Sequence, residues 1–584
     1  WFQTRFLVWL ENFYESQLRA ALTGWKPVIY FAGTFLLLIV SIKFYDIRQP
    51  SVVFFPDTDP QTIYVTMELP LGTSIDRTDE VSRRVENIIN ETIEPYQEIV
   101  KSVTTSVGNG KGGMFENDQS PNKSLTSISF VEFKLRDGIN TSEIMQKLSA
   151  NLSGFVGAKI FVEKEENGPP VGPDVNIEVS GDDFETLIQI TDDFMNRINE
   201  DNIPGLDELK LDINVNQPEM LIHVDRDKAR RYELSTQEVA VALRNSLYGY
   251  DVGDYKDGED EYDIFIRLKE EYRNDVSTLM NQKLMVEGNK IPISAVADFE
   301  YSSTYDKVNR IDHKRVLTIS SSVTEGYNAN EVNARIRQVL ASYEMPAGYD
   351  YAFTGEQQEQ DESSEFLIFA LLIAVALIGL IMVTQFNSFI RPMIIMMTVL
   401  FSTIGVFLGL AIFKMEFVII MTGIGIISLA GIVVNNGIVL IDYIDLMRQR
   451  RRDELGYGEG AFLPVKEEID CLVIAGKTRL RPVLLTAITT VLGLVPLAVG
   501  LNFDFITLYT HFDPDFSLGG ESVAFWGPMS WTVIFGLTFA TFLTLLIAPV
   551  MYMLTIRINY RIKKMMNMLP EDNQPHPEVG EAKD

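Results

Sequence analysis

Six long segments of this chain contain no charged residue and consist mainly of Leu, Ile, Val, Phe, Met and small residues. The segments are Pro27–Ile42, Phe366–Ile390, Pro392–Phe413, Phe417–Ile441, Pro482–Phe503 and Val523–Ile556. A bilayer core of about 30 Å is crossed by roughly 20 apolar helical residues. The first segment is short, but Phe44 and Tyr45 extend it beyond Lys43, whose ammonium group can reach the interface. The pattern predicts six transmembrane helices.

Lys and Arg are concentrated in two of the regions that flank these segments. The loop between the fourth and fifth segments carries Arg448, Arg450, Arg451, Arg452, Lys466, Lys477, Arg479 and Arg481. The tail after the sixth segment adds Arg557, Arg561, Lys563 and Lys564. Because basic loops remain on the cytoplasmic side, both ends of the chain are expected there. The insertion Asp46–Glu365 is then expected outside the inner membrane.

This insertion contains the same order of strand-like and helix-like segments twice. The order is βαββαβ, the split arrangement of ferredoxin-like sandwiches. The first copy has strands Thr62–Leu69, Lys101–Val107, Ser127–Lys134 and Lys159–Glu163 and helices Thr78–Thr92 and Thr141–Leu152. The second has strands Asp174–Ser180, Leu206–Ile213, Val316–Val323 and Tyr349–Thr354 and helices Phe184–Asn199 and Asn330–Tyr343. A smaller unit, Glu219–Ser303, interrupts the second copy, with strands Met220–Val224 and Asp263–Leu268 around helix Thr236–Leu247.

Charge and cysteine content exclude several classes of function. The net charge of −30 argues against a nucleic-acid partner, because phosphate binding needs clustered Lys and Arg. Cys471 is the single cysteine and the four histidines are scattered, so no disulfide framework, metal site or cofactor is expected. Trp1–Leu22 has the aromatic, amphipathic pattern of a helix on a membrane surface. Since the sequence does not start with Met, we interpret it as a fragment of something longer.

Two of the apolar segments carry a specific resemblance. Gly425–Tyr443 (GIISLAGIVVNNGIVLIDY) resembles the tenth helix of resistance-nodulation-division (RND) permeases, and Arg479–Pro496 (RLRPVLLTAITTVLGLVP) resembles the eleventh. Phe54–Asp59 followed by Leu69–Thr73 is similar to the start of the second-half porter domain of the same family. The resemblance covers nearly the whole chain and is strongest to the drug and hydrophobe exporters of the AcrB type.

The resemblance implies the C-terminal half of a permease, with a six-helix membrane domain and an α+β periplasmic domain. The implied division is a membrane-surface helix (1–22), a first transmembrane helix (23–46), a first porter subdomain (47–167), a second porter subdomain (168–218 and 304–358), a docking or funnel subdomain (219–303), five transmembrane helices (359–564) and an acidic cytoplasmic tail (565–584). The two porter subdomains are the ferredoxin-like βαββαβ units, and the docking subdomain is inserted into the second.

The resemblance also implies a function and its partners. The chain is expected to belong to a proton antiporter, a secondary transporter and not an enzyme, which exports hydrophobic or amphiphilic compounds and confers multidrug resistance. Its expected location is the inner membrane of a Gram-negative bacterium. The implied partners are the missing N-terminal half, further copies in a homotrimer, a periplasmic adaptor protein, a TolC-type outer-membrane channel and membrane lipid.

The expected proton-relay neighbourhood lies in the fourth and fifth segments. Ser428, Gly431, Asn435 and Asp442 share a helical face, and polar residues at membrane depth are costly and usually functional. Asn435 stands where the best-known drug pumps have Lys, and the neighbouring Asn436 could equally be interhelical glue. The relay threonine of the family maps onto Thr486 and its cytoplasmic-end arginine onto Arg479. Thr489 and Thr490 are expected to bond their own backbone, and Asp442 and Asp445 to reach water.

Substrate-pocket candidates lie in the first porter unit. Phe130 matches a pocket phenylalanine of the drug pumps, Thr104 stands where another would be, and Met114 and Phe115 lie in a loop between them. That loop replaces the flexible loop that separates the two pockets in the family, and its glycines permit wide backbone freedom. The glycines are Gly108, Gly110, Gly112 and Gly113.

Two other functions remain open besides export. The chain could be a non-transporting half needed only for hetero-oligomer assembly, or an RND relative that handles lipids. The metal-exporting branch of the family is disfavoured, because the fourth segment lacks the charged residues of that branch and the porter region has no Met cluster.

Overall fold

The computed structural model describes residue 5 and residues 7–566 except 49, 57, 111–118, 166–171, 216, 259, 287, 306, 325, 459–460 and 513, and it leaves the side chains of 217 and 521 undescribed. Within these residues, six helices are long and apolar enough to cross a membrane. They are α2 (Lys26–Arg48), α11 (Glu356–Phe386), α12 (Ile390–Phe413), α13 (Ile419–Glu454), α14 (Val465–Val499) and α16 (Glu521–Met565). The six apolar helices expected from the sequence are therefore confirmed.

Helix α16 is central to the bundle and packs against α12, α13 and α14. Glycines allow these helices to approach closely. A Cβ atom added to Gly405 or Gly409 of α12 would collide with Phe535 of α16. A Cβ added to Gly425 of α13 would lie 2.9 Å from Thr532 of α16. In contrast, few residues in the apolar parts of α2, α11 and α14 are buried within this chain.

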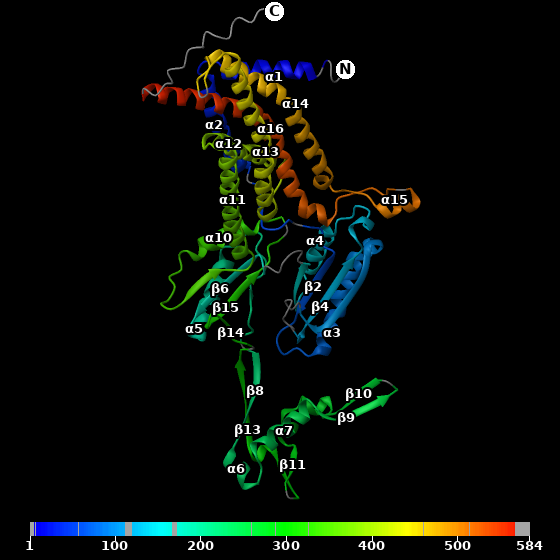
Figure 1. The fold of residues 1–584 in the computed structure, drawn as a ribbon. Helices are drawn as coiled ribbons and strands as arrows, with labels where there is room; N and C mark the ends of the chain where they lie inside the picture. The colour runs from blue at the N-terminus through cyan, green and yellow to red at the C-terminus, as the bar shows by residue number, and fades with distance from the viewer. Residues whose placement is uncertain are drawn as a thin grey trace, which may run out of the picture.

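Helix α1 (Leu7–Leu22) lies across one end of the bundle, which we call the terminal end (Figure 1). Its buried residues, among them Tyr14, Leu18 and Leu22, join the core of the bundle. On another face, Trp9 and Phe13 are exposed, and their rings stack with centroids 5.7 Å apart. One face of α1 is thus packed on the bundle, and another carries exposed aromatic rings.

A four-stranded antiparallel sheet forms the first α+β unit at the opposite end of the bundle, the domain end (Figure 1). Its strands are β2 (Thr62–Glu68), β3 (Val100–Asn109), β4 (Gln119–Phe130) and β5 (Lys159–Lys164), in the order β3-β4-β2-β5. Helices α3 (Ile75–Ile93) and α4 (Thr141–Leu152) pack on one face, where Ile63, Val65, Ile128 and Phe130 form the core with them. The order in the chain is βαββαβ, as the sequence predicts.

The predicted third strand of this unit is shifted along the chain. It was expected at Ser127–Lys134, but β4 begins at Gln119 and ends at Phe130. Lys134 instead lies in the 3-10 turn η3 (Phe133–Leu135). A second 3-10 turn, η2 (Glu94–Ile99), follows α3, where Pro95 sets the first-turn geometry.

The second α+β unit lies at the domain end of α11 and repeats this topology (Figure 1). Its elements are β6 (Val175–Gly181), α5 (Phe184–Glu200), β7 (Lys210–Leu211), β14 (Asn309–Ile311), β15 (Lys314–Ser321), α10 (Ala329–Leu340) and β16 (Asp350–Phe353). The sheet order is β14-β15-β6-β16, and β7 pairs with β15. The strand expected at Leu206–Ile213 is reduced to Lys210–Leu211, with an isolated bridge between Leu206 and Val323.

The inserted unit is connected to the second unit by a ribbon of two antiparallel strands, β8 (Gln217–Val224) and β13 (Ala297–Thr304). Beyond the ribbon lie α6 (Arg226–Arg231), α7 (Thr236–Leu247), α8 (Glu270–Arg273), α9 (Val276–Met280), η4 (Ile293–Ala295) and the hairpin of β11 (Lys283–Val286) with β12 (Asn289–Pro292). A second hairpin pairs β9 (Tyr250–Asp257) with β10 (Asp260–Ile266). The strand expected at Asp263–Leu268 corresponds to β10, whereas β9 was not predicted, although Asp257-Gly258 is a hairpin-turn signal.

Short elements connect the bundle to the α+β units. β1 (Val52–Val53), which follows α2, pairs in parallel with β17 (Phe417–Val418), which precedes α13. Between α14 and α16, β18 (Leu501–Asn502) pairs with β19 (Ser517–Leu518), and the short helix α15 (Phe505–His511) lies between them.

Candidate functional site

The side chains of Asn436 and Thr486 form a polar contact between α13 and α14, in which Asn436 is buried and Thr486 is exposed. The Thr486 hydroxyl lies 3.3 Å from Asn436 Oδ1 and 3.0 Å from the Val483 carbonyl, and it can donate to either. Asn436 is 7% exposed. A buried amide in hydrocarbon is costly unless it is hydrogen-bonded. The contact therefore joins these two helices at this depth.

Asn435 points in a different direction from Asn436. Successive helical residues are about 100° apart, and Asn435 is exposed on the surface of the bundle. Ser428, Gly431 and Asp442 are exposed on the same face, as their spacing predicts. A Cβ on Gly431 would meet nothing within 4 Å. Thus α13 presents a polar face, formed by these four residues, that the described part of this chain leaves uncovered.

Arg479 of α14 lies nearer the terminal end and contacts α13. Its guanidinium carbon is 4.4 Å from the centroid of the Tyr443 ring, a cation–π distance. One turn beyond Thr486, the Thr489 hydroxyl lies 2.9 Å from the Leu485 carbonyl, and the Thr490 hydroxyl lies 2.9 Å from the Thr486 carbonyl. The prediction that Thr489 and Thr490 bond their own backbone is confirmed.

Asp445 does not simply reach water, and the sequence analysis missed its partners. One of its oxygens lies 2.8 Å from Arg391 Nε of α12, and the other accepts a hydrogen bond from the Tyr552 hydroxyl of α16. Tyr552 in turn accepts from Arg448 at 2.8 Å. Arg448 completes the network with two bonds to Glu468 of α14, at 2.6 and 2.7 Å. This network of five residues joins four spanning helices near the terminal end.

The pocket candidates of the first unit do not share a surface. Phe130 is 1% exposed and belongs to the core beneath α3 and α4. Thr104 pairs with Ser127, three residues before Phe130 on β4. Because side chains alternate along a strand, Thr104 faces the opposite, open side of the sheet. Phe130 is therefore a core residue here, and its size and position explain its presence without a ligand.

The loop candidates are described only in part. Gly108 has φ +86°, which favours glycine, and a Cβ there would lie 3.1 Å from Ile75 Cδ1. Gly110 is buried. Gly112, Gly113, Met114 and Phe115 lie outside the described residues.

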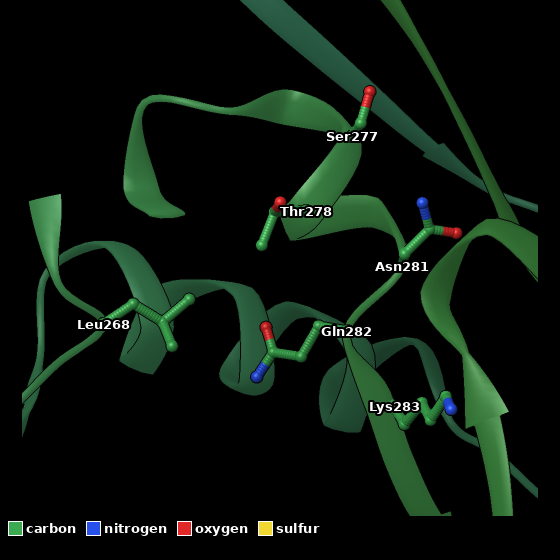
Figure 2. Close-up of a pocket in the computed structure, with 6 residues that line it drawn as sticks. All are labelled: Leu268, Ser277, Thr278, Asn281, Gln282 and Lys283. Atoms are coloured by element: carbon green, nitrogen blue, oxygen red, sulfur yellow. The ribbon is translucent and has the colours of Figure 1, made fainter. Parts of the chain in front are cut away.

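A recess of about 450 Å³ lies in the inserted unit, away from both groups of candidates. It is lined by Leu268, Ser277, Thr278, Asn281, Gln282 and Lys283 (Figure 2). Figure 2 shows these side chains spread around the recess, with Lys283 as the one charged group among the six. The recess is wide open and holds no convergent set of groups that would define a reaction or a ligand.

The chain thus combines six long apolar helices with two βαββαβ units and an inserted unit. Residues 1–556 match the sequence profile of the AcrB/AcrD/AcrF family. The chain therefore belongs to this family, the RND permeases, which are secondary transporters and not enzymes. The expectation drawn from Gly425–Tyr443 and Arg479–Pro496 is thus confirmed.

Individual relatives carry names of more than one substrate class. The cation efflux system protein CzcA of Alcaligenes sp. (strain CT14) is 24% identical over 98% of this chain and 51% of that protein. The multidrug resistance protein MdtC of Escherichia coli O7:K1 is 22% identical over 96% of this chain and 50% of that protein. The swarming motility protein SwrC of Bacillus subtilis is 30% identical over 58% of this chain and 29% of that protein.

A solved structure has the same fold. The crystal structure of a heavy metal efflux pump (crystal form I) superposes with a TM-score of 0.74 at 22% identity, covering 94% of this chain and 52% of that one. This chain spans about half the length of the curated relatives CzcA and MdtC. The names of these relatives cover metal export, multidrug resistance and swarming motility.

Proposed function

We propose that this chain is the second half of a proton-driven RND efflux permease. The observation that carries the proposal is the uncovered polar face of α13 beside the Asn436–Thr486 contact. A polar face within the membrane needs a protein partner, because lipid cannot satisfy it. The partner proposed is the N-terminal half of the same permease, supplying helices that cover Ser428, Gly431 and Asn435.

The proton carrier would come from that partner. The six apolar segments of this chain contain no Asp or Glu, and Asp445 is paired with Arg391 near the terminal end. The Asn435 amide can hydrogen-bond a carboxylate in either protonation state, by donating to the ionised form and by accepting from the neutral one. Asn436, Thr486 and Arg479 would hold α13 and α14 in register behind it.

The basic loops support an orientation with the terminal end in the cytoplasm and the α+β units in the periplasm. In this arrangement the first and second units are the porter subdomains (47–167, and 168–218 with 304–358). The inserted unit (219–303) is the docking subdomain that faces an adaptor protein and a TolC-type channel. The permease would act in the inner membrane of a Gram-negative bacterium as a homotrimer.

The proposed cargo is a hydrophobic or amphiphilic compound, taken from the periplasm or the outer leaflet of the membrane. Export of a metal cation is the second candidate, which the names of CzcA and the heavy metal efflux pump favour. An assembly-only half and a lipid-handling relative are the remaining alternatives.

The deciding experiment measures transport by the complete permease, formed by this chain with its first half. Cells lacking their own pumps are loaded with a fluorescent dye or with Zn²⁺ and then energised, with an uncoupler as the control. We expect uncoupler-sensitive dye efflux that needs both halves. Uncoupler-sensitive Zn²⁺ efflux without dye efflux would move the assignment to the metal branch, and assembly without any export would favour the structural alternative.

A further inference from the structure

The segment β1 lies between the membrane bundle and the second unit and is bonded to both. On the bundle side, Val52 pairs with Phe417 and Val53 with Val418 in parallel register. The Phe417 N–H donates to the Ser51 carbonyl at 3.0 Å, and the Ser51 hydroxyl donates to Glu416 at 2.8 Å. Val418 is also the N-cap residue of α13.

On the other side, two asparagine side chains of the second unit bind the same backbone atom of β1. The Val52 carbonyl accepts from Asn328 Nδ2 at 3.0 Å and from Asn330 Nδ2 at 2.8 Å. Both lone pairs of this oxygen are therefore used. Two amide donors on one carbonyl specify its position more strongly than a single bond would.

The Oδ1 atoms of these two side-chain amides also accept hydrogen bonds. Asn328 Oδ1 caps α10 by accepting from the backbone N–H of Asn330 at 2.8 Å. Asn330 Oδ1 accepts from Gln360 of α11 at 3.0 Å. The pair thus connects the start of α10, the β1 segment and the membrane helix α11.

The first unit is attached to a different helix. Lys134 pairs with Asp515 in the loop that follows α14, and Phe133 packs against Gly519 of the same loop. Gly519 N–H donates to the carbonyl of Gly500, the residue that ends α14, at 3.0 Å. The second unit is therefore connected to α13, and the first unit to the loop that joins Gly500, the C-cap of α14, to Gly520, the N-cap of α16.

We propose that Asn328 and Asn330 are positioning residues for transport, because they make β1, β17, α13 and the second unit move as one body. The sheet of the first unit, which begins at β2, then moves with the loop between α14 and α16. A shift of α13 past α14 changes the spacing of the two units, which lie side by side at the domain end (Figure 1). Asn436 lies roughly 27 Å along α13 from Val418 by helical rise, so a stiff helix carries the displacement between them. This inference rests on the proposed export function.

The first test removes the two donors and keeps every other role of these side chains. In Asn328→Asp/Asn330→Asp, the carboxylates still cap α10 and still accept from Gln360, but they cannot donate to Val52. The complete permease is reconstituted in liposomes, and proton flux and substrate export are measured together. We expect export to fall at least tenfold while proton flux persists, with an unchanged unfolding midpoint. Asn151→Asp, an amide-to-carboxylate change in the first unit, controls for added charge.

The second test replaces the hydrogen bond between Ser51 and Glu416 with a disulfide, so that β1 is linked covalently to the chain before α13. Ser51→Cys/Glu416→Cys is oxidised in a Cys471→Ala background, and pairing is verified by loss of thiol labelling. We expect the crosslinked permease to export at its native rate, because the linked parts never separate. Arrest on oxidation with recovery on reduction would overturn the proposal, as would a parallel fall of proton flux and export in the first test. Absence of proton-coupled export from the native permease would instead reject the proposed function.

Discussion

The side chain of Tyr14 on α1 occupies the space above Gly476 on α14, and no larger residue fits beneath it. A Cβ at position 476 would collide with the Tyr14 hydroxyl, which donates to the Leu545 carbonyl of α16 at 2.8 Å. Tyr14 therefore joins α1 to two spanning helices through one ring. Three ion pairs along the same interface, Glu11–Arg481, Glu15–Lys477 and Arg19–Asp470, surround this ring.

Gly476→Ala is expected to loosen α1 from the bundle. Overpacking of a well-filled site costs about 1–3 kcal/mol, so the unfolding midpoint of the purified permease should fall. Tyr14→Phe in the same chain removes the colliding oxygen and should restore part of the loss. Gly33→Ala is the matched control, because a Cβ at Gly33 meets nothing within 4 Å. Equal midpoints for the two alanine variants would contradict the close fit.

Thr486→Val and Asn436→Leu are expected to be non-additive. Each removes one partner of the same hydrogen bond, and such bonds within membranes contribute about 0.6 kcal/mol on average and up to about 1.7. The double variant should therefore lose less than the sum of the two single losses in unfolding free energy. Thr486→Val with Asn435→Leu should be additive, since these residues lie on different faces.

The same variants separate proton relay from helix packing when export per assembled trimer is measured. Asn435→Leu should reduce export strongly with normal assembly, and Thr486→Val should act in the same direction less severely. Normal specific activity in both would remove Asn435 and Thr486 from the relay.

Glu468→Ala is expected to be strongly destabilising. Glu468 is 1% exposed, and its removal leaves the buried Arg448 guanidinium without its carboxylate. Breaking a buried pair from one side costs about 3–5 kcal/mol, which chemical denaturation in detergent can measure. Arg448→Leu/Glu468→Leu removes both charges and should recover most of this loss. Glu454→Ala removes an exposed partner of Arg451 and should cost at most about 1 kcal/mol.

The attachment of α1 is expected to weaken in acid. Hydrogen bonds from Lys477 and Arg19 lower the pKa of Glu15 below its ordinary value. A carboxyl group whose pKa is lower in the folded state than in the unfolded state stabilises the folded state. This stabilisation is fully present above the unfolded pKa of about 4.3, and it is lost as the pH falls through the folded pKa. Limited proteolysis between Leu22 and Lys26 should therefore accelerate below about pH 4. Glu15→Gln should cleave faster at neutral pH and show a smaller acid response.

The proposed orientation predicts opposite labelling of two cysteine variants. In a Cys471→Ala background, Asp201→Cys lies in the α+β region and Arg451→Cys at the terminal end. An impermeant thiol reagent applied to cells with a permeable outer membrane should label Asp201→Cys alone. Labelling of Arg451→Cys alone would reverse the topology.

The elements of the fold follow from local sequence to a large extent. Uncharged runs of about 20 residues form transmembrane helices, because a helix satisfies the backbone hydrogen bonds of such a run within the lipid. The helices of the α+β units begin near capping residues that the sequence displays, such as Asn140 before α4 and Asp183 before α5. By contrast, the length of β7 depends on distant partners. Beside it the Asp212 N–H donates to the Thr318 carbonyl, and the Thr318 N–H donates to the Asp212 side chain instead of to a backbone carbonyl.

The sequence indicates which helices and strands carry the candidate site residues, but not the directions in which their side chains point. Periodicity places Asn435 and Asn436 on one helix, but which of them meets Thr486 depends on how α14 packs against α13. Phe130 and Thr104 similarly belong to one sheet, and only the pairing of β3 with β4 reveals that they face opposite sides. The Arg391–Asp445 and Ser51–Glu416 contacts join residues far apart in the chain, and no local pattern indicates them.

The ribbon of β8 and β13 brings the two ends of the inserted unit together. All eight residues of one strand pair with the other, from Gln217 with Thr304 to Val224 with Ala297. A segment that leaves and re-enters a fold at adjacent positions can be exchanged without disturbing the host, and the inserted unit has a small core of its own. Residues between Val224 and Ala297 can therefore be replaced in evolution to fit a new partner, while the transmembrane helices and both sheets are retained.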